Sequence, residues 1–367
     1  MKKVFLSLLA VFAVVALVAC GENSGDKTFE VAVVTDVGQL NDGGFNQGTY
    51  EGAVSFAKAS GKTYKYYQPA NGSNANDNDR IAAMNQAIEN GAKIIVTPGF
   101  LQATAITTVA KENPDVKFIF VDGWALGLDN VTAISYKEHE SGFFAGYAAV
   151  KDGYTKLGGT FGGDGGNTAC NLFAYGYVQG IEAAAAELNK NVDVKVSFKY
   201  GGGFSSSTEL QTQISGWYAG GTQIVFSCGG SMLQSVKAAA AETKDGMIIG
   251  VDVDQHNESE RVLTSAVKGL SASVELALNE WKNGEWDTKL KNQCSKLGAA
   301  ENATGLPTAD DAWRFKTFTK EEYKALFDQV VAGTLVIDSE TEGNMNTDEA
   351  WGKLLSKCTH VKFTLEK

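Results

Sequence analysis

The side chains best suited to ligand chemistry gather in one short loop, residues 35–47. Two carboxylates, two carboxamides and one aromatic ring lie within this loop: Asp36, Asp42, Asn41, Asn46 and Phe45. Carboxylates accept hydrogen bonds and carboxamides both donate and accept them, so the loop suits a polar neutral ligand, to which the ring offers a flat face. The alternative is an ordinary Asn/Asp/Gly turn, in which Asn41 or Asp42 caps the helix that follows.

The elements on either side place this loop at a position where ligands bind. An apolar run at 31–34 precedes the loop and predicts a buried strand, and a helix-like run at 48–59 follows it. The loop therefore lies at the C-terminal end of a first strand. Open α/β sheets bind their ligands at that edge.

The succession of strand and helix repeats along the chain. Strands are predicted at 63–68, 93–97, 116–121, 131–135, 157–161, 194–200, 223–227 and 247–251. Helical runs separate most of these strands, which is typical of parallel, doubly wound sheets. We therefore predict an α/β protein of two successive lobes, with a ligand cleft between the C-terminal ends of their strands.

The second half of the chain supplies both lobes with further parts. The N-terminal lobe comprises residues 28–133 plus about 255–315, and the C-terminal lobe comprises residues 134–252 plus about 316–340. Residues 261–267 are a predicted hinge strand, residues 270–281 a helix that returns to the first lobe, and residues 333–337 an edge strand of the second. Residues 344–367 form a C-terminal appendage, a helix followed by a strand.

Residues 1–19 have the features of a secretory signal peptide. Lys2 and Lys3 precede an apolar stretch that is too short to span a membrane comfortably. The stretch ends in Leu-Val-Ala-Cys, which resembles a bacterial lipobox, so we expect cleavage before Cys20 and lipidation of that cysteine. Residues 20–28 then tether the first lobe to the cell membrane, facing the periplasm or the exterior. The alternative is an ordinary signal peptide in which the cysteine has no role.

The charge of the chain argues against a nucleic-acid partner. The formal net charge is −11, and removal of Lys2 and Lys3 leaves 30 basic against 43 acidic residues. Nucleic acids need a basic surface, and an acidic protein also disfavours a phosphorylated ligand. The Gly-rich turn at 162–166 is a weak phosphate site, because it lacks the P-loop lysine and carries Asp164 where a phosphate would bind.

Four cysteines follow Cys20 in the chain. In an exported protein an even number favours disulfides, and the expected pair is Cys294 with Cys358, since both lie in the C-terminal part. Cys170 and Cys228 fall next to predicted strand ends, where they either pair or stay buried. No spacing typical of zinc ligands occurs, so we expect no metal site.

Several motifs together resemble one known family. They are the lipobox, the first-loop pattern DVGxxND-G-G-FN, and the segments YKEHESGFFAG, GVDVDQ and RVLTSAVK. Their order is similar to that in the basic membrane protein (Bmp/Med, PnrA-like) family of bacterial lipoproteins, over roughly residues 30–281. The resemblance implies the type I periplasmic-binding-protein fold and a substrate-binding role for an ABC transporter, with purine nucleosides as the best-known ligands. The chain departs from the family at Gly44, where a serine commonly precedes the phenylalanine, and in residues 283–317 and the tail.

The resemblance also implies a set of ligand contacts. They comprise two aromatic rings, a polar set at the base edge, a set for the ribose and one glycine: Phe45 and Phe204; Asp36, Asn41 and Asn46; Asp122, Asp252 and Lys268; and Gly229. The rings stack on the two faces of the base, the polar sets hydrogen-bond the edge and the sugar hydroxyls, and the glycine lets the backbone approach closely. The alternatives are core packing for the rings, a helix cap for Asn46, and carboxylates at helix N-termini for Asp122 and Asp252. Asp254 replaces Asp252 if the register of that loop differs.

We therefore expect a monomeric, membrane-anchored receptor that binds a purine nucleoside and delivers it to an ABC permease, without a cofactor. Two alternatives stay open: a receptor for a sugar or other small polar ligand on the same fold, and a nucleoside-cleaving enzyme. The enzyme is the weaker alternative, because Asn41 stands where a carboxylate would pair with Asp42. The acidic cluster around His139, which includes Glu138 and Glu140, is interpreted as the exposed start of a helix, since no recognisable nucleophile motif accompanies it.

Overall fold

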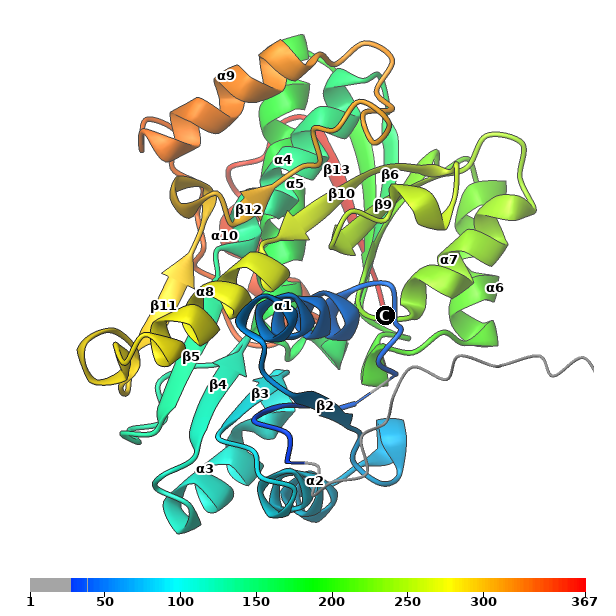
Figure 1. Ribbon diagram of the computed structural model, residues 1–367. Coiled ribbons are helices and arrows are strands. Elements are labelled where there is room, and N and C mark those ends of the chain that lie inside the picture. The colour runs from blue at the N-terminus through cyan, green and yellow to red at the C-terminus, as the bar shows by residue number, and fades with distance from the viewer. Residues whose placement is uncertain (1–27, 38) are drawn as a thin grey trace, which may run out of the picture.

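Two α/β lobes, each built on its own sheet, make up the protein (Figure 1). The computed structural model describes residues 28–37 and 39–367. The predicted signal peptide, the lipidation site Cys20 and residues 20–27 of the tether lie outside the described residues. Among the residues that are described, no helix is both long enough and apolar enough to cross a membrane. All the strands and helices given below lie between residues 31 and 366.

The first lobe is built on a parallel sheet with the strand order β11-β5-β4-β3-β1-β2. Its strands are β1 (Val31–Val34), β2 (Tyr64–Tyr67), β3 (Ile94–Pro98), β4 (Lys117–Val121), β5 (Val131–Tyr136) and β11 (Cys294–Leu297). Two pairs of helices cover the sheet: α1 (Phe45–Ser60) with α8 (Leu270–Lys282), and α2 (Asp77–Glu89) with α3 (Ala103–Glu112). Successive side chains of a strand point to opposite faces, so Val31 packs with the first pair and Ala32 with the second. Because both faces are covered, the strands read as continuous apolar runs.

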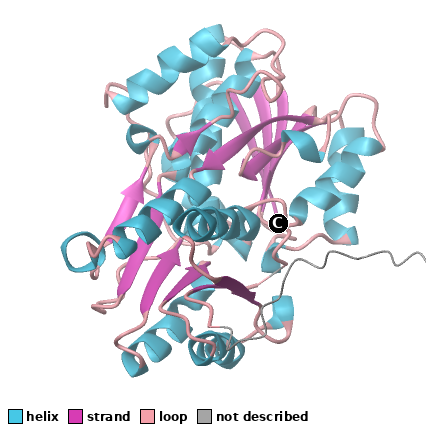
Figure 2. Cartoon of the chain, viewed as in Figure 1, coloured by secondary structure: helices cyan, strands magenta, loops and turns pink. Residues whose placement is uncertain are grey.

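The second lobe is built on a sheet with the strand order β12-β10-β9-β8-β6-β7-β13, in which only β12 is antiparallel to its neighbour. Its strands are β6 (Lys156–Phe161), β7 (Val192–Ser197), β8 (Ile224–Cys228), β9 (Met247–Asp252), β10 (Val262–Lys268), β12 (Thr304–Gly305) and β13 (Val361–Glu366). Its helices are α4 (Glu138–Lys151), α5 (Thr168–Leu188), α9 (Lys320–Val331) and α10 (Asp348–Leu355) on one face, and α6 (Thr208–Ala219) and α7 (Met232–Ala241) on the other. Figure 2 shows the strands of the two lobes as separate sheets.

Glycines allow α4 and α5 to lie in close contact. A Cβ atom at Gly142 or Gly146 would lie 2.2 Å from a carbonyl oxygen of α5, and one at Gly176 would lie 2.0 Å from the carbonyl oxygen of His139. Backbone atoms cannot yield to a side chain as a flexible side chain can, so only glycine fits at these positions. This packing fixes how α4 and α5 lie against each other.

The sheets revise the predicted division of the chain. Strand β10 belongs to the second sheet, and the return to the first lobe begins with α8. Residues 333–337, predicted as an edge strand, form no strand. Gly333 turns the chain at a φ of 69°, and the amides of Thr334 and Leu335 both donate to the Gln329 carbonyl, which folds the segment against the end of α9. The C-terminal strand β13 takes this edge instead, parallel to β7, so the predicted appendage is part of the sheet.

The predicted disulfide between Cys294 and Cys358 is wrong, because both residues are free cysteines. Cys294 begins β11 in the first sheet, and its Sγ lies 3.6 Å from Ser135 Oγ. Cys358 follows α10 in the second lobe, and its Sγ lies 3.4 Å from the Leu354 carbonyl oxygen. The chain crosses from one lobe to the other after β11, so proximity in sequence does not bring these two cysteines together.

Candidate functional site

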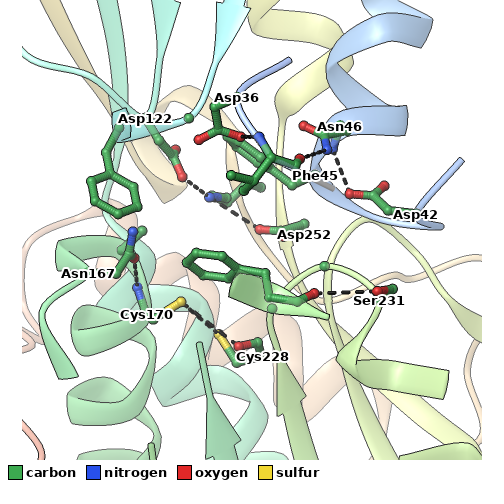
Figure 3. A pocket seen from close by; sticks show the side chains of 18 of the residues that line it. Asp36, Asp42, Phe45, Asn46, Asp122, Asn167, Cys170, Cys228, Ser231 and Asp252 are labelled. Carbon is green, nitrogen blue, oxygen red and sulfur yellow. Dashed lines mark hydrogen bonds and ion pairs between the residues drawn. The ribbon is translucent and has the colours of Figure 1, made fainter. Parts of the chain in front are cut away.

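A cavity lies between the lobes, at the carboxyl ends of strands from both sheets (Figure 3). Of the predicted ligand residues, the first lobe contributes Asp36, Phe45, Asn46 and Asp122 to its lining. The second lobe contributes Phe204, Gly229, Asp252 and Lys268. Asn41 is the exception, since its side chain is exposed and does not belong to the lining. The structure thus brings together eight of the nine residues that the sequence singled out.

Strand ends explain how residues so far apart in sequence meet. Asp36 and Asp122 follow β1 and β4, whereas Asp252 and Lys268 are the last residues of β9 and β10. Asp122 and Asp252 adopt left-handed backbone conformations, with φ of 55° and 69°, and Phe204 does so with a φ of 55°. Such conformations cost a non-glycine residue of the order of 1 kcal/mol or more and concentrate at functional sites.

Lys268 is the centre of the charged end of the cavity. Its Nζ lies 2.7 Å from Asp122 Oδ2, 3.2 Å from Asp252 Oδ1 and 3.9 Å from Glu138 Oε1. Burial by itself disfavours the ammonium, but the three carboxylates outweigh burial and raise the pKa of Lys268 above its usual range. The same Nζ lies 4.8 Å from the ring centroid of Phe45, a cation–π distance. The lysine therefore stays charged and links the strand ends of both lobes.

Burial opposes the ionisation of two of the carboxyl groups around the lysine. Burial raises the pKa of Asp252 to about 6, although the charge of Lys268 opposes the shift. Burial also raises the pKa of Glu138 above its usual range, again against the effect of Lys268. One oxygen of Asp122, Oδ1, is buried and has no hydrogen-bond partner within the described chain. That oxygen remains able to accept a hydrogen bond from a ligand.

The start of α4 is buried rather than exposed as predicted. Glu138, His139 and Glu140 are each less than a tenth exposed. Glu140 Oε2 accepts hydrogen bonds from the Ala299 amide at 2.6 Å and the Thr304 hydroxyl at 2.7 Å. Burial lowers the pKa of His139 to about 4, so the imidazole is neutral at physiological pH. These partners could not be foreseen from the residues of the helix, because they come from chain segments far beyond it.

The polar residues of the first loop have two roles, because Asp42 caps helix α1 and Asn46 lines the cavity. The carboxylate of Asp42 accepts hydrogen bonds from the amides of Gly44, Asn46 and Gln47, at 2.9, 3.0 and 3.2 Å, and so caps the start of α1. The amide nitrogen of the Asn46 side chain donates to the carbonyl oxygens of Val37 and Gln39. Its Oδ1 is buried without a partner in the described chain, which leaves a second acceptor for a ligand.

Asp36 lies against the backbone of Gly99. A Cβ atom at Gly99 would lie 1.8 Å from Asp36 Oδ2, and the glycine has a φ of 103°, so a side chain is excluded there. The Val37 amide donates to Asp36 Oδ1 at 2.6 Å. Burial nevertheless dominates and raises the pKa of Asp36 to about 7. Near neutral pH this carboxyl group is therefore present in both protonation states.

Phe45 and Phe204 come from opposite lobes, and both are only partly buried. Glycines of the second lobe make room for the Phe204 ring: a Cβ atom at Gly162 would lie 2.4 Å from it, and one at Gly229 would lie 3.1 Å from it. The Gly-rich turns of this lobe thus leave space for the Phe204 ring to pack closely against the backbone. A third ring, Phe100 of the first lobe, contacts Phe204 edge to face at a centroid distance of 6.5 Å.

The lobes also touch each other through residues outside the cavity lining. Gln255 Nε2 donates to the Gly43 carbonyl oxygen at 2.8 Å, and its Oε1 accepts from the Val251 amide at 2.9 Å. The hydroxyl groups of Ser73 and Ser205 lie 3.5 Å apart. Together with the ion pair between Lys268 and Asp122, these contacts hold the two lobes together.

Several lining residues escaped the sequence analysis: Phe100, Asn167, Cys170, Phe173, Cys228 and Ser231. Phe100 follows β3 and Cys228 ends β8, so the strand-end rule that found Asp122 applies to them as well. Asn167 caps α5, where its Oδ1 accepts from the Cys170 amide at 2.8 Å. Within the described residues, no group of three or more His, Cys, Asp or Glu side chains is arranged to hold a metal ion.

Comparison with known proteins gives concordant matches. A family model described as "Bmp: ABC transporter substrate-binding protein PnrA-like" matches residues 29–330. The "ABC transporter nucleoside-binding protein BmpA" of Lactococcus lactis is 29% identical over 340 residues, which cover 83% of this chain and 93% of that protein. An uncharacterized lipoprotein of Pyrococcus furiosus is 26% identical and covers 96% of this chain and 89% of its own length. A solute-binding protein of an ABC transporter from Aeropyrum pernix superposes with a TM-score of 0.72 at 19% identity, over 90% of this chain and 97% of that one, which shows the fold.

Proposed function

Because this chain belongs to the Bmp family of PnrA-like ABC transporter substrate-binding proteins, we propose that it binds a purine nucleoside in the cavity between its lobes. The family resemblance expected from the motifs is confirmed, and so is the fold of the periplasmic-binding-protein type. The family binds substrates for transport, which fits a protein without a catalytic role. The nucleoside is our inference, drawn from the cavity and from the name of the Lactococcus relative.

The observation that carries the proposal is the pair of rings from opposite lobes. Phe45 and Phe204 line one cavity, and neither is fully buried in a hydrophobic core. A base held between them gains roughly 1–3 kcal/mol from each ring, whatever its exocyclic groups. A sugar without a base would leave both rings without a flat partner.

The polar groups of the cavity suit the rest of a nucleoside. Asn46 Oδ1 is an acceptor without a partner in the described chain, and Asp36 is able to accept or donate near neutral pH, so both suit the edge of a purine. Asp122 and Asp252 accept from hydroxyl groups and Lys268 donates to them, so we assign the ribose to this charged end. Gly229 lines the same cavity without a side chain.

The charges of the cavity favour a neutral ligand. Four carboxyl groups line it against the one ammonium of Lys268, which three carboxylates already surround. A phosphate would add negative charge to this surplus in a region of low dielectric, where repulsion is strong. We therefore expect nucleosides to bind and nucleotides to be rejected.

We further propose that the protein is held at the membrane through Cys20 and passes its ligand to the permease of an ABC transporter, acting as a monomer. The lipobox-like sequence and the lipoprotein relative from Pyrococcus support the anchor. The family supports a transporter as partner. Closure of the lobes around the ligand would present the loaded form to that partner.

The test is a ligand screen by thermal unfolding of the chain from Gly21 onward, which contains all the described helices and strands. The panel comprises purine and pyrimidine nucleosides, their nucleotides, free bases, ribose and other sugars. A ligand that binds only the folded state at 100 times its Kd stabilises that state by about 2.7 kcal/mol and raises the melting temperature. We expect purine nucleosides to raise it. A rise with sugars alone, or release of free base during incubation, would refute the proposal.

A further inference from the structure

Two neighbouring cysteine thiols belong to the cavity lining, and neither is among the proposed nucleoside contacts. Cys170 lies in the first turn of α5, and Cys228 is the last residue of β8. Their Sγ atoms lie 3.9 Å apart, and both residues line the cavity as free thiols (Figure 3). The other two described cysteines lie outside this lining.

We propose that Cys170 and Cys228 form a redox-active dithiol, which an external disulfide converts into an intramolecular disulfide that reshapes the ligand cavity. Only its effect on ligand affinity rests on the function proposed above, since the oxidation itself needs no ligand. A disulfide joins its sulfur atoms at about 2.05 Å, so the two thiols must approach by nearly 2 Å. Exported proteins meet oxidising surroundings, in which neighbouring thiols form such bonds.

The chemistry is thiol–disulfide exchange with a low-molecular-weight disulfide. One cysteine thiolate attacks the external disulfide, forms a mixed disulfide and releases one external thiol. The second cysteine thiolate attacks the protein sulfur of the mixed disulfide and releases the other external thiol. Two electrons pass from the cysteine sulfurs to the oxidant, and the two thiol protons go to the released thiols. Burial, together with the neighbouring Cys170 thiol, raises the pKa of Cys228, so exchange through Cys228 accelerates as the pH rises.

Movement at the thiols reaches the cavity wall through short backbone connections. Cys228 precedes Gly229 and Gly230, and a Cβ atom at Gly230 would lie only 2.7 Å from the Phe204 carbonyl oxygen. The Ser231 amide donates to that same oxygen at 3.0 Å. A shift at the end of β8 therefore displaces Phe204, the ring assigned to one face of the base. We expect oxidation to weaken nucleoside binding about tenfold, in the lower part of the range for losing one stacked ring.

The test compares reduced protein with protein treated with glutathione disulfide, using the chain from Gly21 onward. Thiol titration of the denatured protein should fall from four thiols to two, and peptide mapping should locate the disulfide between Cys170 and Cys228. Calorimetric titration with a purine nucleoside should give a Kd about ten times higher for the oxidised form. The double variant Cys294→Ser/Cys358→Ser should respond like the parent. The double variant Cys170→Ser/Cys228→Ser, which leaves no thiol in the cavity lining, should have the same Kd with and without oxidant.

Two results would overturn the inference. One is a count of four thiols after treatment, or a disulfide that involves Cys294 or Cys358. The other is a disulfide at the expected place with an unchanged cavity, read from hydrogen exchange of peptides spanning residues 201–206 and 228–232. Because exchange and thiol counts need no ligand, they decide this inference even if no nucleoside binds and the proposed function fails.

Discussion

Replacement of Asp122 tests the proposed ribose contact most directly. Its Oδ2 holds Lys268 at 2.7 Å, and its buried Oδ1 has no partner among the described residues. The backbone φ of 55° limits the choice of substitution, because alanine is strained in this region whereas asparagine and glycine tolerate it. Asp122→Asn removes the charge and keeps the shape, and Asp122→Gly removes the whole side chain. Neither variant leaves Lys268 without an ion-pair partner, since Asp252 Oδ1 remains 3.2 Å from its Nζ.

The expected losses follow from the hydrogen bonds at stake. A hydrogen bond to a charged group contributes about 1.5–3 kcal/mol and a neutral one about 0.5–1.5 kcal/mol. Asp122→Asn exchanges the first kind for the second and should raise the Kd for a purine nucleoside about 5- to 15-fold. Asp122→Gly loses the bond altogether and should raise the Kd about 10- to 150-fold.

Calorimetric titration of the parent and both variants with one purine nucleoside measures these changes. The matched control is Asp254→Asn, two residues beyond Asp252, because Asp254 is exposed and lies outside the cavity lining. Unfolding in urea verifies that each variant is folded at the assay temperature. A Kd within a factor of two of the parent for both folded Asp122 variants would refute the ribose assignment. A large loss of affinity in Asp254→Asn would mean that Asp254, and not Asp252, contacts the ligand.

Three further predictions concern stacking, pH and packing. Phe45→Ala and Phe204→Ala should each weaken purine nucleoside binding by about 1–3 kcal/mol in calorimetric titration. Burial raises the pKa of Asp36 to about 7, so ionisation of this group lowers the stability of the parent as the pH rises from 4 to 8. Asp36→Asn lacks this ionisation, so its unfolding free energy in urea should rise relative to that of the parent over the same pH range. Gly176→Ala should lower the unfolding free energy in urea by about 1–3 kcal/mol, because its Cβ would lie 2.0 Å from a backbone oxygen. Gly216→Ala in α6 should raise the unfolding free energy by about 0.5–1 kcal/mol, because a Cβ there would meet no atom within 4 Å.

Each of these predictions has an outcome that would count against it. Trp124→Ala removes an aromatic ring that is half exposed and outside the cavity lining, so a loss of affinity as large as that of Phe204→Ala would deny a special role to stacking. An unfolding free energy difference between Asp36→Asn and the parent that does not vary with pH would show that Asp36 has an ordinary pKa. Equal effects of Gly176→Ala and Gly216→Ala would contradict the close approach of α4 and α5.

The sequence was most informative where a residue's position depends on its near neighbours. Strands of a doubly wound sheet are covered on both faces, so β3 and β9 appear as short apolar runs that are easy to find. Asp122 and Asp252 both line the cavity, and each comes directly at the end of such a run. Asn41 and Asp42 show the limit of this reasoning, since the turn of one loop decides which side chain faces solvent and which caps α1.

Features that depend on distant partners could not be predicted. The charged start of α4 reads as an exposed helix end until Lys268 and Thr304 are placed beside it. The pairing of Cys294 with Cys358 assumed that the C-terminal part is one unit, but the chain between them crosses from one lobe to the other. Strand β10 has the apolar pattern of any buried strand, and nothing in that pattern specifies which sheet it joins.

The order of strands in the two sheets has a consequence for how the chain folds during its synthesis. Strand β11 pairs with β5 across about 160 residues of intervening chain, and β13 pairs with β7 across about 170. Closing such long loops is entropically costly, and contacts of this kind slow folding. A chain emerging from its N-terminus therefore carries an unfinished edge at β5 until β11 follows, and one at β7 until β13 follows. Until its partner strand arrives, each of these edges is open to pairing with other chains, so the nascent protein is prone to aggregate while either edge is uncovered.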